Sequence, residues 1–435
     1  MKKTFALFLV FACLFLTACN QNPPVGPGTS GGTDATGESV SSDKPAGSDQ
    51  PQDPAGSVPK DMIVCHVPNG YIDLPSRVMF EMGVASGKIY NVYYSKADGE
   101  TYPYCFDPLC DHSGGKCLAY PSSWELGSFY PDTTCFINDR FYLSSNSLGK
   151  IVSFHFDGTD MKIEYDAGYQ RGDIPNGPWT PNIEVYGSYI YLDQREAASE
   201  DGKKHLLRFN TETKEMEDLT EKTGNYIWPS FFYNGEMYGQ DTVWNCMKAS
   251  PDLTVCETAE EFRFSPFFYG SKFMYPVQDE KYNTLGIGCY DVETGEEKML
   301  SNEALGIPEG GVATMIAMDE NYIYYVNNQK LLVGYTLHPK TGAKISVYKY
   351  NDGKIFRANH DGTGAACIYD DPDMTYNDSQ AIVFDGKNII IHGNSYCAVE
   401  GETEGLVKQC DAGYYVGTFR EDGTIGEWKL IQAVY

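Results

Sequence analysis

The amino-acid sequence predicts an all-β protein whose folded part is a β-propeller. Three observations lead to this fold class. A short turn followed by a strand of alternating aromatic and aliphatic residues recurs along residues 61–435, most of these units continue into two further short strands, and helix signals are weak. Four short antiparallel strands, repeated at a period of roughly 35–65 residues, are typical of propeller blades. The recurring strand occurs seven times, so we expect seven blades, with six and eight as the alternatives.

The first element, residues 1–18, has the layout of a signal peptide. Lys2 and Lys3 precede the apolar stretch Phe5–Leu16, which has signal-peptide length and is short for a bilayer span. The motif "LTAC", which ends in Cys19, resembles a bacterial lipobox. This resemblance implies cleavage before Cys19 and lipidation of its sulfur, with an ordinary secretory signal as the alternative. The expected location is therefore extracytoplasmic, lipid-anchored to the bacterial cell membrane or surface.

The second element, residues 19–60, is predicted to be a disordered tether. Pro, Gly, Ser, Thr and Asp dominate it, and large apolar residues are almost absent. Such a segment cannot bury enough surface to offset the entropy of ordering its chain. The remaining residues, 61–435, are expected to form a single β-propeller domain.

Composition and charge restrict the classes of partner. The chain is 42% hydrophobic and 14% aromatic, and it has 33 basic and 60 acidic residues for a formal net charge of -27. Nucleic acids and anionic lipid surfaces both require a positive protein surface. We therefore expect no nucleic acid partner and membrane contact through the N-terminal lipid only. We also expect a monomer. Cationic partners and divalent cations remain compatible with this charge.

The recurring strand defines the order of the blades. Each copy follows a turn that often contains Gly, Asn or Asp, residues that tolerate the positive φ of tight hairpins. We assign it as the second strand of each blade. The seven copies are Ser86–Tyr94, Asn138–Ser145, Tyr186–Asp193, Tyr233–Gln240, Tyr269–Pro276, Asp319–Val326 and Phe384–Gly393.

Three long insertions fall between the second and third strands of their repeats. They cover residues 195–204, 327–352 and 393–413. In a propeller, the loops between these strands emerge on the same face as the connections between blades. We expect the insertions to cluster on that face around the channel mouth, where variable loops on a rigid scaffold usually bind partners. The alternative is decoration without a function.

A cluster of cysteines and one histidine follows the first copy of the repeat. Cys105, Cys110, His112 and Cys117 have the spacing C-x4-C-x-H-x4-C. We expect them in an elaborated turn between the third and fourth strands, at the outer rim and away from the loop-bearing face. Three interpretations remain open: a disulfide, a structural Cys3His zinc site, and a reactive thiol activated by His112.

Other residues suggest covalent or ionic cross-links. Cys246 and Cys256 flank one predicted hairpin, and Cys397 and Cys410 flank another. Each pair is a candidate cross-strand disulfide, with buried thiols as the alternative. The acidic segment Asp370–Asp378 is a candidate for calcium although it lacks the 12-residue calcium-loop pattern, and a solvated loop is the alternative. Catalytic sequence motifs are absent, so no catalytic residue is predicted.

The chain also resembles a known group of proteins. The signal, the tether, the repeats and the cluster "CFDPLCDHSGGKCLAY" together resemble uncharacterised β-propeller lipoproteins of gut Firmicutes. The later repeat "KIFRANHDGTG" resembles a domain of unknown function with TolB-type propeller repeats. The resemblance implies a propeller and a surface location, and it brings no activity.

These observations predict a cell-surface-anchored lipoprotein whose propeller is a binding module. The expected ligand is a protein, a peptide or a glycan, bound through the loop-bearing face. One alternative is a carbohydrate-active enzyme, a lyase or hydrolase, on the same scaffold. The other is a structural or assembly platform without a small-ligand site.

Overall fold

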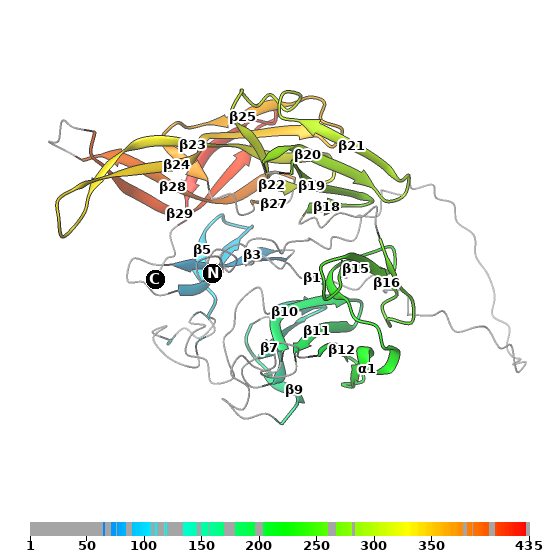
Figure 1. The fold of residues 1–435 in the computed structure, drawn as a ribbon. Coiled ribbons are helices and arrows are strands. Elements are labelled where there is room, and N and C mark those ends of the chain that lie inside the picture. The colour runs from blue at the N-terminus through cyan, green and yellow to red at the C-terminus, as the bar shows by residue number, and fades with distance from the viewer. Residues whose placement is uncertain are drawn as a thin grey trace, which may run out of the picture.

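The described chain is almost entirely β-sheet, arranged as a seven-bladed β-propeller (Figure 1). The computed structural model describes residues 64–65, 71–74, 76–83, 89–105, 109–110, 117, 119, 134–145, 149–155, 157–168, 179–195, 203–259, 267–280, 283–376, 381–384, 386–399 and 405–431. Within these residues the strands form seven antiparallel sheets. The predicted fold class and blade number are confirmed. The predicted signal and tether, with Cys19, lie outside the described residues.

The first three blades are numbered here in chain order. Blade 1 contains β2 (Tyr71–Leu74), β3 (Arg77–Gly83), β4 (Ile89–Ser95) and β5 (Thr101–Pro103). Blade 2 contains β1 (Val64–Cys65), β6 (Thr134–Ile137), β7 (Arg140–Ser145), β8 (Lys150–His155) and β9 (Lys162–Asp166). Blade 3 contains β10 (Trp179–Tyr186), β11 (Tyr189–Arg195), β12 (Lys204–Asn210) and β13 (Met216–Asp218).

The last four blades follow the same plan. Blade 4 contains β14 (Trp228–Tyr233), β15 (Glu236–Gln240), β16 (Cys246–Ala249) and β17 (Cys256–Thr258). Blade 5 contains β18 (Phe267–Tyr269), β19 (Lys272–Gln278), β20 (Thr284–Asp291) and β21 (Glu296–Ser301). Blade 6 contains β22 (Val312–Met318), β23 (Tyr322–Leu337), β24 (Lys344–Asn359) and β25 (Ala366–Asp370). Blade 7 contains β26 (Met374–Tyr376), β27 (Ile382–Phe384), β28 (Asn388–Ala398), β29 (Val407–Phe419) and β30 (Ile425–Leu430).

The assignment of the recurring strand is right in six blades and wrong in the first. Residues 86–94 were expected to be a second strand, but they overlap β4, the third strand of blade 1. The hairpin of β2 and β3 supplies the first two strands. Residues 101–103 therefore form the fourth strand, β5.

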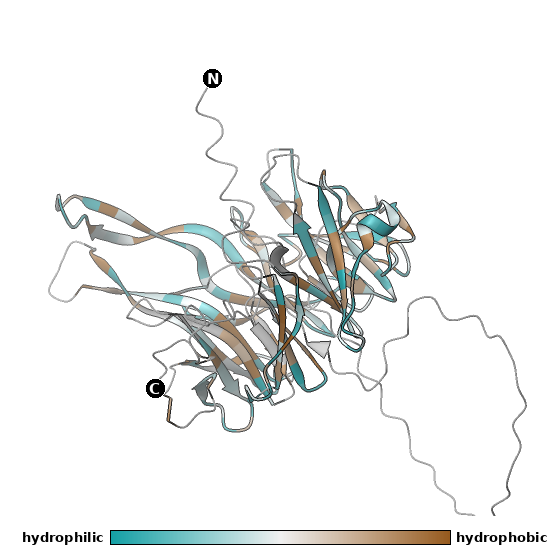
Figure 2. Ribbon diagram, turned by 90° about the horizontal axis from the view of Figure 1, so that it is seen from below, coloured by the Kyte–Doolittle hydropathy of each residue, from teal (hydrophilic) through white to brown (hydrophobic). Residues whose placement is uncertain are grey.

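Seven buried clusters hold the blades together, and each cluster lies between two neighbouring blades. Alternate residues of a strand contribute to different clusters, because successive side chains point to opposite faces of a sheet. In β7, Phe141 and Leu143 pack toward blade 1, whereas Tyr142 packs toward blade 3. Apolar residues accordingly recur along the blade strands in Figure 2.

The ring closes through side chains between blades 7 and 1. Val78 and Phe80 of β3 pack against Ile390 and Val416 of the last blade. Lys429 of β30 adds an ion pair with Glu100, at 2.8 Å. In the part of the chain that the structure describes, the sheet of blade 7 is built only from C-terminal strands. Closure therefore depends on packing between sheets.

A short helix, α1 (Leu219–Thr223), follows blade 3 and was not expected. Asp218 caps its first turn by accepting a hydrogen bond from the Glu221 backbone N–H, and Gly224 ends it in the left-handed conformation. These residues are common helix start and stop signals. Across the described residues, no helix has the length and apolar character needed to cross a membrane.

Replacing a side chain of an inter-blade cluster should destabilise the whole ring. Phe141 is fully buried, and its ring contacts those of Tyr104, Phe136 and Phe154. We expect Phe141→Ala to lower the free energy of unfolding by about 3–5 kcal/mol, because the cavity loses packing on several sides. Chemical denaturation measures this change. The control Val243→Ala removes a side chain that is 69% exposed and should change stability by about 0.5 kcal/mol or less; similar effects of the two variants would contradict this account.

Candidate functional site

Two hairpins extend beyond the ring from blades 6 and 7. Figures 1 and 2 both show them side by side, projecting away from the blades. In β23 the residues up to Asn327 are largely buried, and beyond that point most are exposed or half-buried. Residues 327–352 are named here the basic arm, and residues 393–413 the acidic arm. The insertions predicted at these positions are thus largely continuations of blade strands.

The base of the basic arm is fixed by buried amide side chains. Asn327 donates from Nδ2 to Asp352 Oδ2 at 2.8 Å. Asn351 donates to the Tyr376 carbonyl oxygen and accepts from the Tyr376 backbone N–H at 3.0 Å. Gly353 follows at φ 80°, and an added Cβ would collide with the Asp371 carbonyl oxygen. These contacts hold the direction in which the arm leaves blade 6.

One face of the basic arm is apolar and aromatic. The register places Leu332 opposite Tyr348 and Leu337 opposite Lys344. Side chains alternate along a strand, so Tyr348 and Tyr350 share one side of β24 with Lys344. A bulge between Leu332 and Gly334 keeps Leu332 and Leu337, their partners on β23, on that same side. The side that carries Leu332, Leu337, Tyr348 and Tyr350 is named here the arm face. Leu332 is 52% exposed and Tyr350 60% exposed. Exposed apolar side chains grouped on one surface often mark an interaction site.

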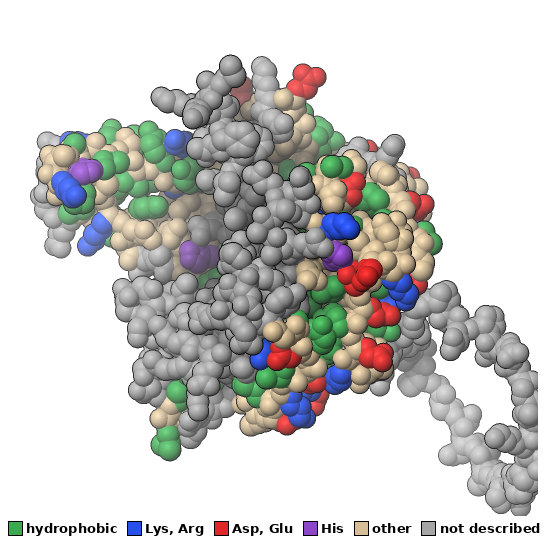
Figure 3. All heavy atoms as spheres, turned by 60° about the horizontal axis from the view of Figure 1, so that its bottom comes forward, with side chains coloured by type: hydrophobic (Ala, Val, Ile, Leu, Met, Phe, Trp, Pro, Cys, Tyr) green, Lys and Arg blue, Asp and Glu red, His purple; other side chains and the backbone are tan. Residues whose placement is uncertain are grey.

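Lysines border the arm face. The Lys330 ammonium lies 4.3 Å from the centre of the Tyr348 ring, and the Lys344 ammonium lies 5.8 Å from the Tyr335 ring. Cation–π contacts of this kind hold a charge beside an aromatic surface. Figure 3 shows hydrophobic side chains interleaved with basic ones on the projecting part of the molecule. The arm face therefore offers apolar contact with positive charge at its edge.

The two arms have opposite charge. The basic arm has four lysines and one aspartate, although the chain as a whole has a net charge of -27. The acidic arm has three glutamates, one aspartate and one lysine. Burial lowers the pKa of Lys349, whose Nζ donates to the Pro372 carbonyl oxygen. Lys349 is half-buried, and the exposed lysines of the basic arm are Lys330, Lys340 and Lys344.

A backbone contact joins the arms. The Tyr335 N–H donates to the Gly405 carbonyl oxygen at 3.0 Å, and Tyr335 forms a parallel bridge with Leu406. A Cβ on Gly334 would lie 2.6 Å from that carbonyl oxygen and 2.8 Å from a methyl group of Val407. A glycine inside a strand often marks such a close backbone approach. The arms therefore meet as one extended surface.

A disulfide cross-links the acidic arm. The structure pairs Cys397 of β28 with Cys410 of β29, with their Cα atoms 5.9 Å apart. The second predicted pair, Cys246 and Cys256, does not meet. Cys256 lies opposite Ala249 rather than Cys246, and the two side chains pack into clusters on opposite faces of blade 4. A disulfide requires Cα atoms within about 7 Å and converging side chains.

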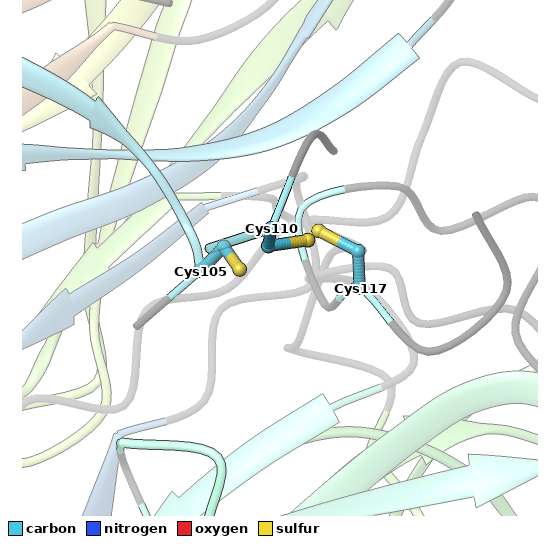
Figure 4. Close-up of side chains that lie close together, drawn as sticks. All are labelled: Cys105, Cys110 and Cys117. Atoms are coloured by element: carbon cyan, nitrogen blue, oxygen red, sulfur yellow. The ribbon is translucent and has the colours of Figure 1, made fainter. Parts of the chain in front are cut away.

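Three of the four residues of the Cys/His cluster converge in space. The Sγ atoms of Cys105, Cys110 and Cys117 all lie within 4.8 Å of one another. Figure 4 shows the sulfurs of Cys110 and Cys117 pointing toward each other, with Cys105 beside them. His112 lies outside the described residues. Among the residues that the structure describes, this is the one group of three or more metal-ligating side chains in such proximity.

The position of this cluster corrects the sequence-based expectation. It was expected between the third and fourth strands, remote from the loop-bearing face. It instead follows β5, the fourth strand, in the connection from blade 1 to blade 2. Such connections emerge with the loops between second and third strands, so the cluster lies on the same face as the arms.

Backbone hydrogen bonds close the loop that carries the three cysteines. The Tyr104 N–H donates to the Asn91 carbonyl oxygen, and the Asn91 N–H donates to the Ala119 carbonyl oxygen, both at 2.9 Å. One residue of β4 thus holds both ends of the loop. Cys117 is only 5% exposed, and burial raises the pKa of its thiol, with the neighbouring Cys110 and Cys105 thiols adding to the rise.

The described part of the acidic segment, residues 370–376, forms a turn and a strand. Asp371 and Asp373 lie in the turn, where the Asp373 N–H donates to the Asp371 carboxylate. Met374–Tyr376 then form the buried strand β26. Residues 377–378 lie outside the described residues. The calcium prediction gains no support from these contacts.

No protein-family model matches the chain, and no curated protein sequence matches it. Solved structures give partial similarity. The acylaminoacyl peptidase of Pyrococcus horikoshii is 10% identical with a TM-score of 0.42, covering 82% of this chain. This chain spans 50% of that protein's length.

Two further solved structures are similar to the chain. TolB of Acinetobacter baumannii is 12% identical, with a TM-score of 0.32 and coverage of 84% of this chain and 78% of that one. BamB of Moraxella catarrhalis is 13% identical, with a TM-score of 0.32 and coverage of 80% and 83%. At these values the similarities assign no activity, substrate or partner.

Reducing the disulfide should loosen the acidic arm and leave the ring intact. The bridge closes a loop with a sequence separation of 13, for which chain entropy predicts about 3 kcal/mol. In Cys397→Ser/Cys410→Ser we therefore expect amide hydrogen exchange of residues 394–413 to accelerate by up to about two orders of magnitude. Hydrogen-exchange mass spectrometry measures this, with β19 and β20 as the internal control. Unchanged exchange in the arm would show that strand pairing alone holds it.

Proposed function

We propose that the protein is a lipid-anchored, extracytoplasmic binding module that engages a protein partner through the arm face. The observation that carries this proposal is the extension of β23 and β24 beyond the ring, where Leu332, Leu337, Tyr348 and Tyr350 share one exposed side. The ring needs none of these side chains for its own packing between blades. The fixed base of the arm presents them in a constant orientation, which lowers the entropic cost of binding.

The chemistry of the arm face favours a protein over a glycan. Leu332 and Leu337 offer aliphatic surface, which cannot hydrogen-bond the hydroxyl groups of a sugar. Small ligands and sugars are usually enclosed in concave sites with convergent polar groups, whereas this surface is the side of a projecting ribbon (Figure 1). Tyrosines beside aliphatic residues and a charged rim are typical of protein interfaces.

Charge complementarity supports one kind of partner. Lys330, Lys340 and Lys344 give the basic arm a positive edge on a chain whose net charge is -27. Complementary charge at a rim accelerates association and excludes wrong partners. We therefore propose a protein partner with an apolar patch bordered by carboxylates. The acidic arm beside it would repel carboxylates that approach from the other side and so help to set the orientation.

The N-terminal segments would place this module at the cell surface. The lipobox at Cys19 supports lipid anchoring, and the Pro/Gly/Ser-rich residues up to 60 support a tether. A flexible chain of this length has an end-to-end distance of roughly 35 Å, from about 5–6 Å times the square root of the residue number. The propeller, as a monomer, would search a volume of that size above the membrane.

Lipidation should depend on Cys19 alone. In Cys19→Ala we expect loss of labelling by radioactive palmitate and release of the chain from the membrane fraction, because the acyl chains supply the membrane affinity. Cys13→Ala is the matched control, since Cys13 belongs to the predicted signal peptide. Persistent labelling of Cys19→Ala would contradict the lipobox assignment.

Binding through the arm face predicts a charge-dependent photocrosslink. A photoreactive amino acid at Tyr348, in the full-length protein on its producing cells, should give a discrete adduct with another protein. We expect Lys330→Glu/Lys344→Glu to reduce this adduct at least about tenfold, because the reversed charges would face carboxylates of the partner. Gel analysis and mass spectrometry measure its yield and composition.

Matched positions distinguish this result from non-specific capture. Lys222→Glu reverses an exposed charge on α1 and should leave the adduct unchanged. The photoreactive residue at Met299, which is half-exposed on β21, should give no such adduct. An equal yield at Met299, or indifference to the reversal of Lys330 and Lys344, would reject the arm face as the binding site. An adduct of two copies of this chain would identify self-association and reject a heterologous partner.

A further inference from the structure

We propose that Cys105, Cys110 and Cys117 form a structural site for a thiophilic divalent metal, of which zinc is the best fit. This site is distinct from the arm face and does not rest on the proposed function. Three thiols from one loop converge, with their Sγ atoms within 4.8 Å of one another. Thiolate sulfur is a preferred ligand of zinc, and three thiolates form most of a closed structural site.

The distances fit tetrahedral coordination after a small adjustment. Zinc–sulfur bonds of about 2.3 Å place neighbouring sulfur atoms of a tetrahedral site about 3.8 Å apart. The three Sγ atoms lie within 4.8 Å, so a contraction of about 1 Å or less would bring them to this spacing. Side-chain rotation of the half-buried Cys105 and Cys110 can supply it.

Both ends of the loop that carries the three cysteines are already fixed by packing and hydrogen bonds. A metal would therefore stabilise the interior of this loop. Tyr104 is fully buried and packs edge-on against Tyr93 and Phe141. Cys117 and Ala119 are buried at the other end, and the Asn91 backbone holds both ends together. A metal bound by the three sulfurs would cross-link the interior of this loop to its base. It would stabilise the connection between blades 1 and 2.

A metal accounts for the cluster better than a disulfide. One disulfide uses two of the three thiols and leaves the third beside it, whereas a metal engages all three. Binding replaces three S–H bonds by three sulfur–metal bonds and releases up to three protons to solvent, without any change in oxidation state. His112 stands between Cys110 and Cys117 in the sequence. Its assignment as the fourth ligand stays a prediction of the sequence.

Elemental analysis of the full-length protein tests the site. The protein is purified from its producing cells without chelators, and bound zinc is measured by inductively coupled plasma mass spectrometry. We expect about one zinc per chain, reduced at least about tenfold in Cys110→Ser, because two thiolates hold the ion far more weakly. Cys367→Ser is the matched control and should retain the metal, since Cys367 is an exposed thiol on β25 of blade 6.

A second measurement uses the unmodified protein, so that it tests the site even if the Cys110→Ser variant does not fold. Replacing zinc by cobalt(II) in the unmodified protein should produce the thiolate-to-cobalt charge-transfer bands and intense visible bands of a tetrahedral sulfur-rich site. Peptide mapping under denaturing conditions should recover Cys105, Cys110 and Cys117 as thiols. A disulfide between two of these cysteines, a chain without metal whose three thiols are reduced, or full zinc content in Cys110→Ser would each overturn the proposal.

Discussion

Packing on both faces of every sheet is the constraint on which the rest of this structure depends. A blade has no helix to cover it, so each of its faces must be buried by a neighbouring blade. Seven clusters meet this requirement around the ring, one between each pair of neighbours. In β28, Ile389 and Ile391 pack toward blade 6 while Ile390 packs toward blade 1. The same alternation closes the ring between blades 7 and 1 by side-chain packing.

The two arms begin where their strands leave the ring and their faces are no longer buried by neighbouring blades. Up to Asn327, successive residues of β23 are buried between two neighbouring blades, and beyond it the strand leaves the ring and meets the acidic arm through the backbone of Tyr335. The pairing of β23 with β24 nevertheless continues to Leu337 and Lys344, because backbone hydrogen bonding needs only one partner strand. Side chains such as Leu332 and Tyr348 are therefore free of any packing requirement of the fold. Their apolar character needs another explanation, and binding supplies one.

The blades can be predicted from the sequence because burial of both sheet faces leaves a recognisable residue pattern. Strands buried on both faces are rich in aromatic and aliphatic residues, and turns with Gly, Asn or Asp separate them. The same pattern cannot say which strand of a blade it marks, since second and third strands are buried alike. For this reason the pattern predicts a second strand at residues 86–94, although they overlap β4, the third. This wrong assignment also places the predicted Cys/His cluster on the face opposite to the arms.

The prediction of the arms and of the disulfides from the sequence depends on other information. Residues 345–350 contain Ile, Val and two Tyr, and this enrichment in β-branched and aromatic residues favours a strand over a loop. For Cys246 and Cys256, spacing was consistent with a cross-strand bridge, but the register of β16 and β17 directs them to opposite faces. Register depends on the turn and on burial in both neighbouring blades, and neither can be deduced from cysteine spacing.

The arms and the thiol cluster share one face for a topological reason. Connections between second and third strands, and those between blades, emerge at the same end of every sheet. An insertion there lengthens a hairpin or a crossover without altering the pairing of the four strands that close the ring. Tyr104 and Asn91 show this separation in blade 1, where buried and hydrogen-bonded residues finish the sheet before the cysteine loop begins. The ring thus acts as a rigid support, and the chemistry that remains available for recognition and metal binding gathers at the end where the chain can vary.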